Sequence, residues 1–159
     1  ANRGIPVQPR LLLSKEDSLS GEIIPSNVSS QPAKPATEAS LDQVIQSMTA
    51  VMHSPRGTAR ASGRRSPYQI AGKTGTAQVI GIAQDEEYDE SVIPEKFHDH
   101  ALFIAFAPVD NPQIAIAVVV ENGGSGAKVA APIARKIMDR FFQKKLQRAA
   151  APSKHHVFG

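Results

Sequence analysis

The stretch YQIAGKTGTAQVIG, residues 68–81, encloses a compact polar cluster, Gly72-Lys73-Thr74-Gly75-Thr76. The residues around this cluster are largely apolar and predict a strand over residues 68–82. A single cation followed by two hydroxyl groups is suited to binding an anion. The anion can be a phosphate or a carboxylate, and the two targets predict different proteins.

A phosphate site of the P-loop type requires the pattern G-x-x-x-x-G-K-[ST], followed by a helix whose N-terminal amides bind the phosphates. Gly72-Lys73-Thr74 supplies only the second half of this pattern, because Pro67 stands where the first glycine is required. Residues 77–81 favour a continuing strand over a helix. Because both requirements fail, a nucleotide-binding function is disfavoured.

A carboxylate site fits the cluster better. Lys73 supplies positive charge, and the hydroxyls of Thr74 and Thr76 can bond the terminal carboxylate of a peptide that follows the strand edge. In an ideal strand Lys73 and Gly75 share one face and the two threonines share the other, so local twist must bring both sets to one ligand. Because Gly75 has no side chain, another backbone could lie close to the strand at this position. The simpler alternative is an exposed strand with a solvated lysine.

An amphipathic helix is predicted before the cluster. Ser40 and Gln43 have capping-box spacing at its start, and Pro55 and Gly57 end it. Its apolar face follows the helical repeat and consists of Leu41, Val44, Ile45, Met48, Val51 and Met52.

The other segments before the cluster are short or irregular. Residues 11–13 are apolar and predict a strand, closed by a charged turn at residues 15–17. The Pro- and Ser-rich residues 25–39 predict a loop, as does the basic segment 57–67.

Two strands and a helix are predicted after the cluster. Residues 102–109 and 113–120 are apolar runs separated by Asp110-Asn111-Pro112, which predicts a hairpin. The second run is apolar at nearly every position, so we expect both of its faces to be covered. The final helix places Pro132 in its first turn and keeps Val129, Ile133, Ile137 and Phe141 in register. The order helix, strand, strand, strand, helix predicts an α+β fold, with an antiparallel sheet flanked by helices.

Composition excludes several classes of function. The chain has 159 residues and no cysteine, which excludes disulfides, Cys-based zinc sites and a Cys nucleophile. No run approaches the roughly 18 apolar residues of a membrane span. The net charge of +3 is concentrated in residues 134–148 without interleaved nucleic-acid-binding motifs, so nucleic acid is not an expected partner.

Neither a metal nor a cofactor is expected. His98 and His100 flank Asp99, and neighbours in a strand point to opposite faces, so only the two histidines would converge. A third ligand is not apparent in the sequence, and a role in anchoring a loop is the better interpretation. The acidic residues 83–100 can form the rim of a groove or a solvated loop.

K-T-G is one of three motifs of the active-site serine enzymes that recognise penicillin. Around it the sequence resembles the monofunctional (class B) penicillin-binding proteins, and within them the elongation-type penicillin-binding protein 2. The resemblance covers roughly residues 1–24 and 40–146. It rests on an ordered series of phrases: Ala1-Asn2-x-Gly4, Gly57-Thr58-Ala59, residues 68–78, Asp99-His100-Ala101-Leu102, Phe106-Ala107-Pro108, Asn111-Pro112-Gln113 and Val120-Glu121-Asn122-Gly123-Gly124.

The resemblance implies a D,D-transpeptidase that cross-links peptidoglycan stem peptides through a serine acyl-enzyme and that β-lactam antibiotics acylate. Lys73 would direct positive charge toward the substrate carboxylate, and Thr74 and Thr76 would bond that carboxylate. The Thr76 N–H would be one of two oxyanion-hole donors, and Gly75 would give the substrate room. The resemblance also implies cell-elongation membrane proteins as partners and a location at the periplasmic face of the bacterial inner membrane, through an N-terminal anchor outside this chain.

The family's other two motifs, S-x-x-K and S-x-N, precede K-T-G and are not recognisable in the first 72 residues. One literal S-x-x-K, Ser125-Gly126-Ala127-Lys128, follows K-T-G in a Gly-rich junction, where Ser125 is better interpreted as a helix cap. We therefore expect residues 1–148 to be the C-terminal part of a transpeptidase domain, inactive alone, and residues 149–159 to be a disordered tail.

Two other functions are compatible with the same superfamily. One is a non-catalytic module that senses or binds β-lactams, and the other is a β-lactamase. Sequence upstream of residue 1 would separate these from a transpeptidase, and the phrases over residues 99–124 favour the transpeptidase.

Overall fold

The computed structural model describes residues 1–6, 11–12, 14–25, 37–79 and 93–150. The chain divides into two compact units, Ala1–Gln43 and Val44–Gly159, and each is described by itself. Among the described helices, none is both long enough and apolar enough to cross a bilayer.

The first unit contains a small antiparallel hairpin of β1 (Ser14–Glu16) and β2 (Ile23–Pro25). Its turn is held by the Asp17 carboxylate, which accepts the N–H groups of Leu19 (2.8 Å) and Ser20 (3.0 Å). The prediction of a strand over residues 11–13 followed by a turn at 15–17 is therefore wrong by several residues. The Asp17 side chain supplies the acceptor that the turn requires. Gly21 supplies the backbone freedom, because it adopts a positive φ of 69°.

Helix α1 (Glu38–His53) confirms the predicted helix, which begins earlier than expected. The hydroxyl of Thr37 accepts the Ser40 N–H at 3.2 Å, so Thr37 caps the helix and Ser40 lies within it. In this first unit Arg3 forms ion pairs with Glu38 (2.6 Å) and Asp42 (2.7 Å), which join the start of the chain to the first turns of α1. The helix ends at His53, shortly before Pro55 as predicted.

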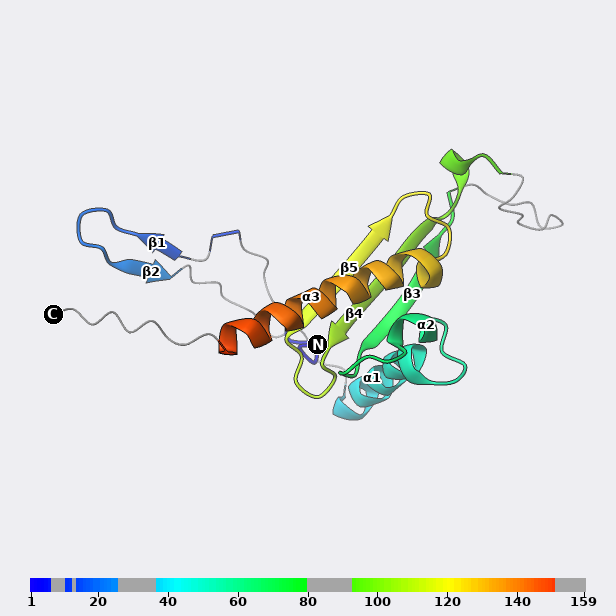
Figure 1. Cartoon of the computed structure of the whole chain (residues 1–159), viewed down its shortest axis with the longest axis horizontal. Helices are drawn as coiled ribbons and strands as arrows, with labels where there is room; N and C mark the ends of the chain where they lie inside the picture. The colour runs from blue at the N-terminus through cyan, green and yellow to red at the C-terminus, as the bar shows by residue number, and fades with distance from the viewer. Residues whose placement is uncertain (7–10, 13, 26–36, 80–92, 151–159) are drawn as a thin grey trace. The chain divides into compact units, whose positions relative to one another are not determined.

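The second unit is built on a three-stranded antiparallel sheet in the order β3-β4-β5 (Figure 1). Strands β3 (Ala71–Ala77), β4 (His100–Ala107) and β5 (Ile114–Val120) confirm the predicted meander and its hairpin. Within the described residues β3 is shorter than the strand predicted over 68–82, and residues 80–82 lie outside the described part. The loop predicted over residues 25–39 also lies largely outside the described part. Its described residues belong to the end of β2 and the start of α1.

The basic segment before β3 contains a short helix, α2 (Arg60–Gly63), where only a loop was predicted. The segment folds back onto the end of α1, and the N–H of Ala59 bonds the carbonyl of Val51 at 3.1 Å. Gly63 lies against the Met52 carbonyl so closely that a Cβ there would overlap it. Tertiary contact with α1, rather than local propensity, therefore produces this turn of helix.

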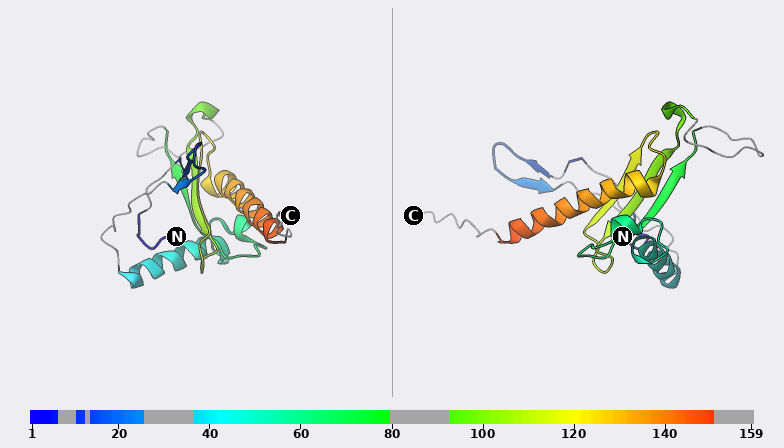
Figure 2. Two further views of the ribbon diagram at one scale, coloured as in Figure 1. Left: turned by 90° about the vertical axis from the view of Figure 1, so that its left-hand side faces the viewer. Right: turned by 45° about the vertical axis from the view of Figure 1, so that its right-hand side comes forward.

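One face of the sheet is covered by the C-terminal helix, as the two rotated views make clear (Figure 2). This helix begins as a π-helical turn, η2 (Gly126–Ala130), and continues as α3 (Ala131–Ala150). Alternate β4 side chains, with Phe103 at their centre, pack into one core cluster with Met52 and with the buried face of α3. That buried face consists of Ala131, Ala134 and Met138, with Phe142 partly buried, and the buried Ala130 at the end of η2 continues it.

The buried face of α3 is not the face that was predicted from the apolar repeat, but the one beside it. Ile133, Ile137 and Phe141 remain 39%, 46% and 37% exposed, whereas the alanines are fully buried. Small side chains allow a helix backbone to approach a sheet closely, so packing favours alanine where hydrophobicity alone favours isoleucine and phenylalanine. Ala149 and Ala150 belong to α3, so the predicted tail begins inside a helix, and residues 151–159 lie outside the described part.

The opposite face of the sheet is open within the described residues. Ile104 on β4 is 53% exposed and Val119 on β5 is 63% exposed, and alternate β5 residues share this exposure. The prediction that both faces of the last strand are covered is therefore wrong for this part of the chain. An apolar run on β5 reflects an apolar surface here rather than double burial.

Candidate active site

Strand β3 carries the polar cluster at the accessible edge of the sheet. Lys73 pairs with Ile104 and Thr74 with Phe103, so their side chains lie on opposite faces, as the period of a strand requires. Lys73 and Thr76 are exposed and Thr74 is half-buried. All three groups are therefore available to a ligand at this strand, and their chemical roles remain predictions.

The cluster is organised by two local bonds. The Lys73 ammonium donates to the backbone carbonyl of Thr74, which holds its charge beside the strand. The hydroxyl of Thr74 lies 3.3 Å from that of Thr58, and either can be the donor. Thr58 was not assigned to the site from the sequence. The sequence feature that could have identified Thr58 is the phrase Gly57-Thr58-Ala59. This phrase is part of the family resemblance, but no role was assigned to its residues.

Glycines allow close backbone packing around β3. A Cβ on Gly75 would lie 3.1 Å from the Leu102 Cβ, and a Cβ on Gly126 would overlap the carbonyl oxygens of Leu102 and Gly75. The backbone that lies close to Gly75 is thus that of η2, from the same chain. Gly72 similarly leaves space for the Phe103 ring, whose Cζ would be 2.6 Å from an added Cβ. Room for a substrate at Gly75 remains a prediction.

In the described part of the chain, β3 is hydrogen-bonded to β4 alone, so its other edge has no partner strand. An edge strand presents unpaired N–H and C=O groups that can bind an extended peptide by strand addition. The cluster therefore combines two elements of peptide recognition, a free strand edge and a cation with hydroxyl groups at the same strand.

Asn122 and the two histidines anchor the chain that leads into β4, beside the far end of β3. His100 Nδ1 accepts the Asn122 N–H at 3.0 Å, and the Asn122 side chain donates to the carbonyls of Lys96 (3.0 Å) and His98 (2.9 Å). Asn122 has a positive φ of 53°, a conformation that asparagine tolerates well. Over residues 93–150 the histidines act in loop anchoring, and no group of three metal-ligating side chains is found in the described residues.

Ser125 has the predicted role of a cap. Its hydroxyl accepts the Lys128 N–H at 3.4 Å at the start of η2, and its carbonyl accepts the Val129 N–H at 2.9 Å. The literal S-x-x-K is therefore part of a helix start. Most of the acidic connection, residues 83–92, lies outside the described residues, and its last part forms the short helix η1 (Glu95–Phe97).

Residues 1–139 match the family described as penicillin binding protein transpeptidase domain. The chain is 40% identical over 143 residues to the peptidoglycan D,D-transpeptidase MrdA of Salmonella typhimurium, covering 89% of this chain and 23% of that protein. It is also similar to the crystal structure of Pseudomonas aeruginosa PBP2 in complex with WCK 5153, at 43% identity and a TM-score of 0.59, covering 74% of this chain and 23% of that one.

A further similar structure is the complex between PBP2 and MreC from Helicobacter pylori, at 28% identity and a TM-score of 0.59, covering 76% of this chain and 21% of that one. The chain spans about a quarter of the length of curated relatives that it matches. The match extends through the cluster on β3 and the helices and strands that position it. The chain is similar to proteins of the PBP2 (MrdA) type, and it belongs to the penicillin-binding protein transpeptidase domain family.

Proposed function

We propose that these residues form the carboxylate-binding strand of a peptidoglycan D,D-transpeptidase that cross-links stem peptides. The observation that carries the proposal is the free edge of β3, where Lys73, Thr74 and Thr76 are all accessible. A stem peptide would add to this edge as an extended strand. Its terminal carboxylate would be bound by the Lys73 charge and by the two hydroxyls.

The chemistry would proceed by acyl transfer. A serine oxygen attacks the penultimate D-Ala carbonyl, the terminal D-Ala leaves as an amine, and the acyl-enzyme is then attacked by the amine of a second stem peptide. The N–H of Thr76 would donate to the oxygen that becomes negative in each tetrahedral intermediate. Since Ser125 caps η2, the nucleophile is expected from outside residues 1–159, and this chain alone would be inactive.

The whole protein would bind β-lactam antibiotics in place of the peptide, as the family description indicates. Its location would be the periplasmic face of the bacterial inner membrane. Because a PBP2 from Helicobacter pylori forms a complex with MreC, a membrane protein of cell elongation is the partner that we propose.

Labelling of the complete protein with a fluorescent penicillin tests this function. Lys73→Ala should lower the second-order rate constant of acylation about 100-fold, because a preorganised charge at the site is lost. The matched control is Lys128→Ala, an exposed lysine on η2 that should leave the rate unchanged.

Peptide mapping of the labelled protein locates the acylated serine. The adduct should lie outside residues 1–159, and Ser125→Ala should label normally. A stoichiometric adduct on Ser125 would overturn the proposal. Rapid turnover of the penicillin without a stable adduct would identify a β-lactamase instead.

A further inference from the structure

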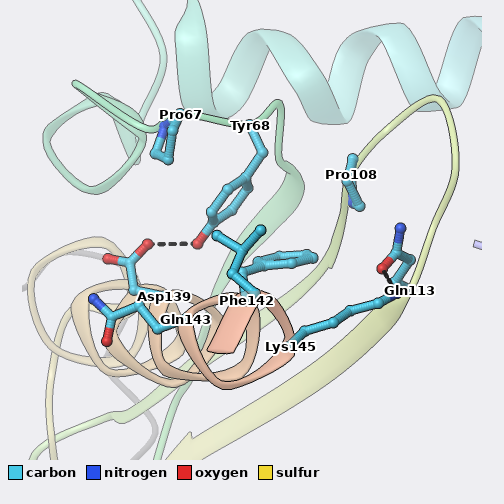
Figure 3. Close-up of a pocket in the computed structure, with 9 residues that line it drawn as sticks. Pro67, Tyr68, Pro108, Gln113, Asp139, Phe142, Gln143 and Lys145 are labelled. Atoms are coloured by element: carbon cyan, nitrogen blue, oxygen red, sulfur yellow. Dashed lines mark hydrogen bonds between the residues drawn. The ribbon is translucent and has the colours of Figure 1, made fainter. Parts of the chain in front are cut away.

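The C-terminal half of α3, the residues that lead into β3 and the β4–β5 turn enclose a pocket of about 650 Å³ (Figure 3). This volume falls in the range of roughly 300–1,000 Å³ that is usual for small-molecule sites. None of its lining residues belongs to the cluster on β3, and the proposed function does not use it. The lining residues are Pro67, Tyr68, Pro108, Gln113, Asp139, Phe142, Gln143, Lys145 and Leu146.

The walls of this α3 pocket are mainly flat and apolar. The rings of Tyr68 and Phe142 lie 4.5 Å apart between centroids at an interplanar angle of 49°, and Pro67 and Pro108 add two further rings. Leu146 is 72% exposed at the rim, where an apolar side chain gains little from water contact. Surfaces of this kind favour an aromatic ligand, which can stack on or pack edge-on against the rings.

The pocket is held in shape by polar contacts rather than by apolar packing alone. The Tyr68 hydroxyl donates to Asp139 Oδ1 at 2.6 Å, and Arg135 Nε donates to both Asp139 oxygens at 2.9 Å. Burial and the bond to Asp139 raise the pKa of Tyr68, so the phenol stays protonated and continues to donate. Arg135 also bonds the Ser62 carbonyl at 2.8 Å, which fixes α3 against α2.

The charges around the pocket favour an anion. Asp139 is the one acidic residue among the described lining residues, and both of its oxygens already accept hydrogen bonds. Lys145 donates to the side-chain oxygen of Gln113, which is neutral, so the ammonium charge at that end is not balanced by this contact (Figure 3). An anionic group near Lys145 would gain a charge-assisted hydrogen bond without displacing an existing ion pair.

We propose that the α3 pocket binds a compact aromatic molecule carrying one anionic group, with its rings packed against the paired Tyr68 and Phe142 side chains and the anion at Lys145. This inference stands independently of the proposed function. The pocket wall also leads into β3, because Tyr68 lies shortly before Ala71 and the neighbouring Gln69 carbonyl accepts the Val109 N–H at 3.2 Å. A bound ligand would therefore contact the segment that positions the candidate active strand.

Fluorescence titration of the complete protein with two matched probes tests the site. One probe is 8-anilinonaphthalene-1-sulfonate, and the other is N-phenyl-1-naphthylamine, which has the same rings without the sulfonate. Lys145→Met should weaken binding of the sulfonate about three- to fivefold, the effect of one accessible ion pair. It should leave the neutral probe unchanged. Lys144→Met, at the adjacent exposed lysine outside the pocket, should change neither affinity.

Filling the pocket is the second arm of the test. Leu146→Trp should weaken both probes at least tenfold, and Gln143→Trp provides an independent filling variant if the first disturbs folding. Ile104→Thr on the open sheet face controls for adsorption to exposed apolar surface and should leave both affinities unchanged. The proposal is overturned if neither probe binds, if the filling variants bind normally, or if Lys145→Met and Lys144→Met have equal effects on the sulfonate.

Discussion

The hydroxyls of Thr58 and Thr74 form a pair at the candidate site, and either hydroxyl can be the donor. A threonine hydroxyl has one proton and two lone pairs. If Thr74 gives its proton to a substrate carboxylate, it can no longer donate to Thr58, and the 3.3 Å contact must then run from Thr58 to Thr74. We therefore propose Thr58 as a positioning residue, which would orient the Thr74 hydroxyl and increase its polarity.

Thr58→Val should lower the rate constant of penicillin acylation in the complete protein about two- to tenfold, the effect of one neutral hydrogen bond. Thr58→Ser should restore the rate, because it returns the hydroxyl without the methyl group. The measurement is the same labelling assay used for Lys73. A normal rate in the valine variant together with a reduced rate in the serine variant would show that packing of the methyl group matters rather than the hydroxyl, and would contradict this role.

Helix α3 shows how an element is oriented by packing. Met138 is 1% exposed against the sheet, while the adjacent Ile137 is 46% exposed, although isoleucine is at least as hydrophobic as methionine. The helix rotates so that its alanines and Met138 contact β4, since this brings the two backbones close and leaves few voids.

Truncation of these two neighbours should therefore have unequal effects. Met138→Ala should lower the free energy of opening of β4 by about 2–5 kcal/mol because it leaves a cavity in the core cluster that contains Phe103. Ile137→Ala, the matched control, should lower it by less than about 1 kcal/mol. Amide hydrogen exchange of residues 101–106 in the complete protein measures both effects. A larger loss for Ile137→Ala would mean that α3 is rotated toward the register predicted from hydrophobicity.

At the scale of the whole second unit, His53 connects the end of α1 to the chain leading into β3. Its Nε2 accepts the Ile70 N–H at 3.0 Å, which requires a neutral ring. Loss of hydration around the ring, and then the positive charge of Arg135, lower the pKa of His53 below its usual 6.5. The unfolded chain thus binds a proton more readily than the folded chain as the pH falls through about 6.5.

The contribution of His53 to stability should be complete above about pH 6.5 and should decrease as the pH falls from there toward the lower folded pKa. His53→Gln keeps an acceptor for Ile70 and removes the titration, so the variant should lose less stability than the wild type between pH 7.5 and 5.5. Denaturant unfolding at each pH measures the difference. A titration midpoint for His53 at or above 6.5, followed by NMR, would contradict this account.

Much of the fold was predictable from local patterns. The meander of β3, β4 and β5 followed from two apolar runs joined by a Pro-containing turn, and α1 followed from its apolar repeat. The errors lie where contacts distant in sequence decide the outcome: α2 forms on the end of α1, and α3 buries alanines instead of isoleucines. The first hairpin lies several residues later than predicted because the Asp17 side chain forms the turn. The hydrophobic pattern carries no information about this local hydrogen bonding.

The sequence by itself determined the family and the identity of the cluster on β3, because an ordered series of phrases and a strand with one lysine and two hydroxyls are local properties of the chain. Tertiary structure decided which groups meet. The Thr58 hydroxyl contacts that of Thr74 although α2 separates them in the sequence, Gly126 packs against Gly75, and Tyr68 packs against α3 beside a pocket. Contacts between residues so far apart depend on how helices and sheet pack, and close packing is a property of the assembled core rather than of any one segment.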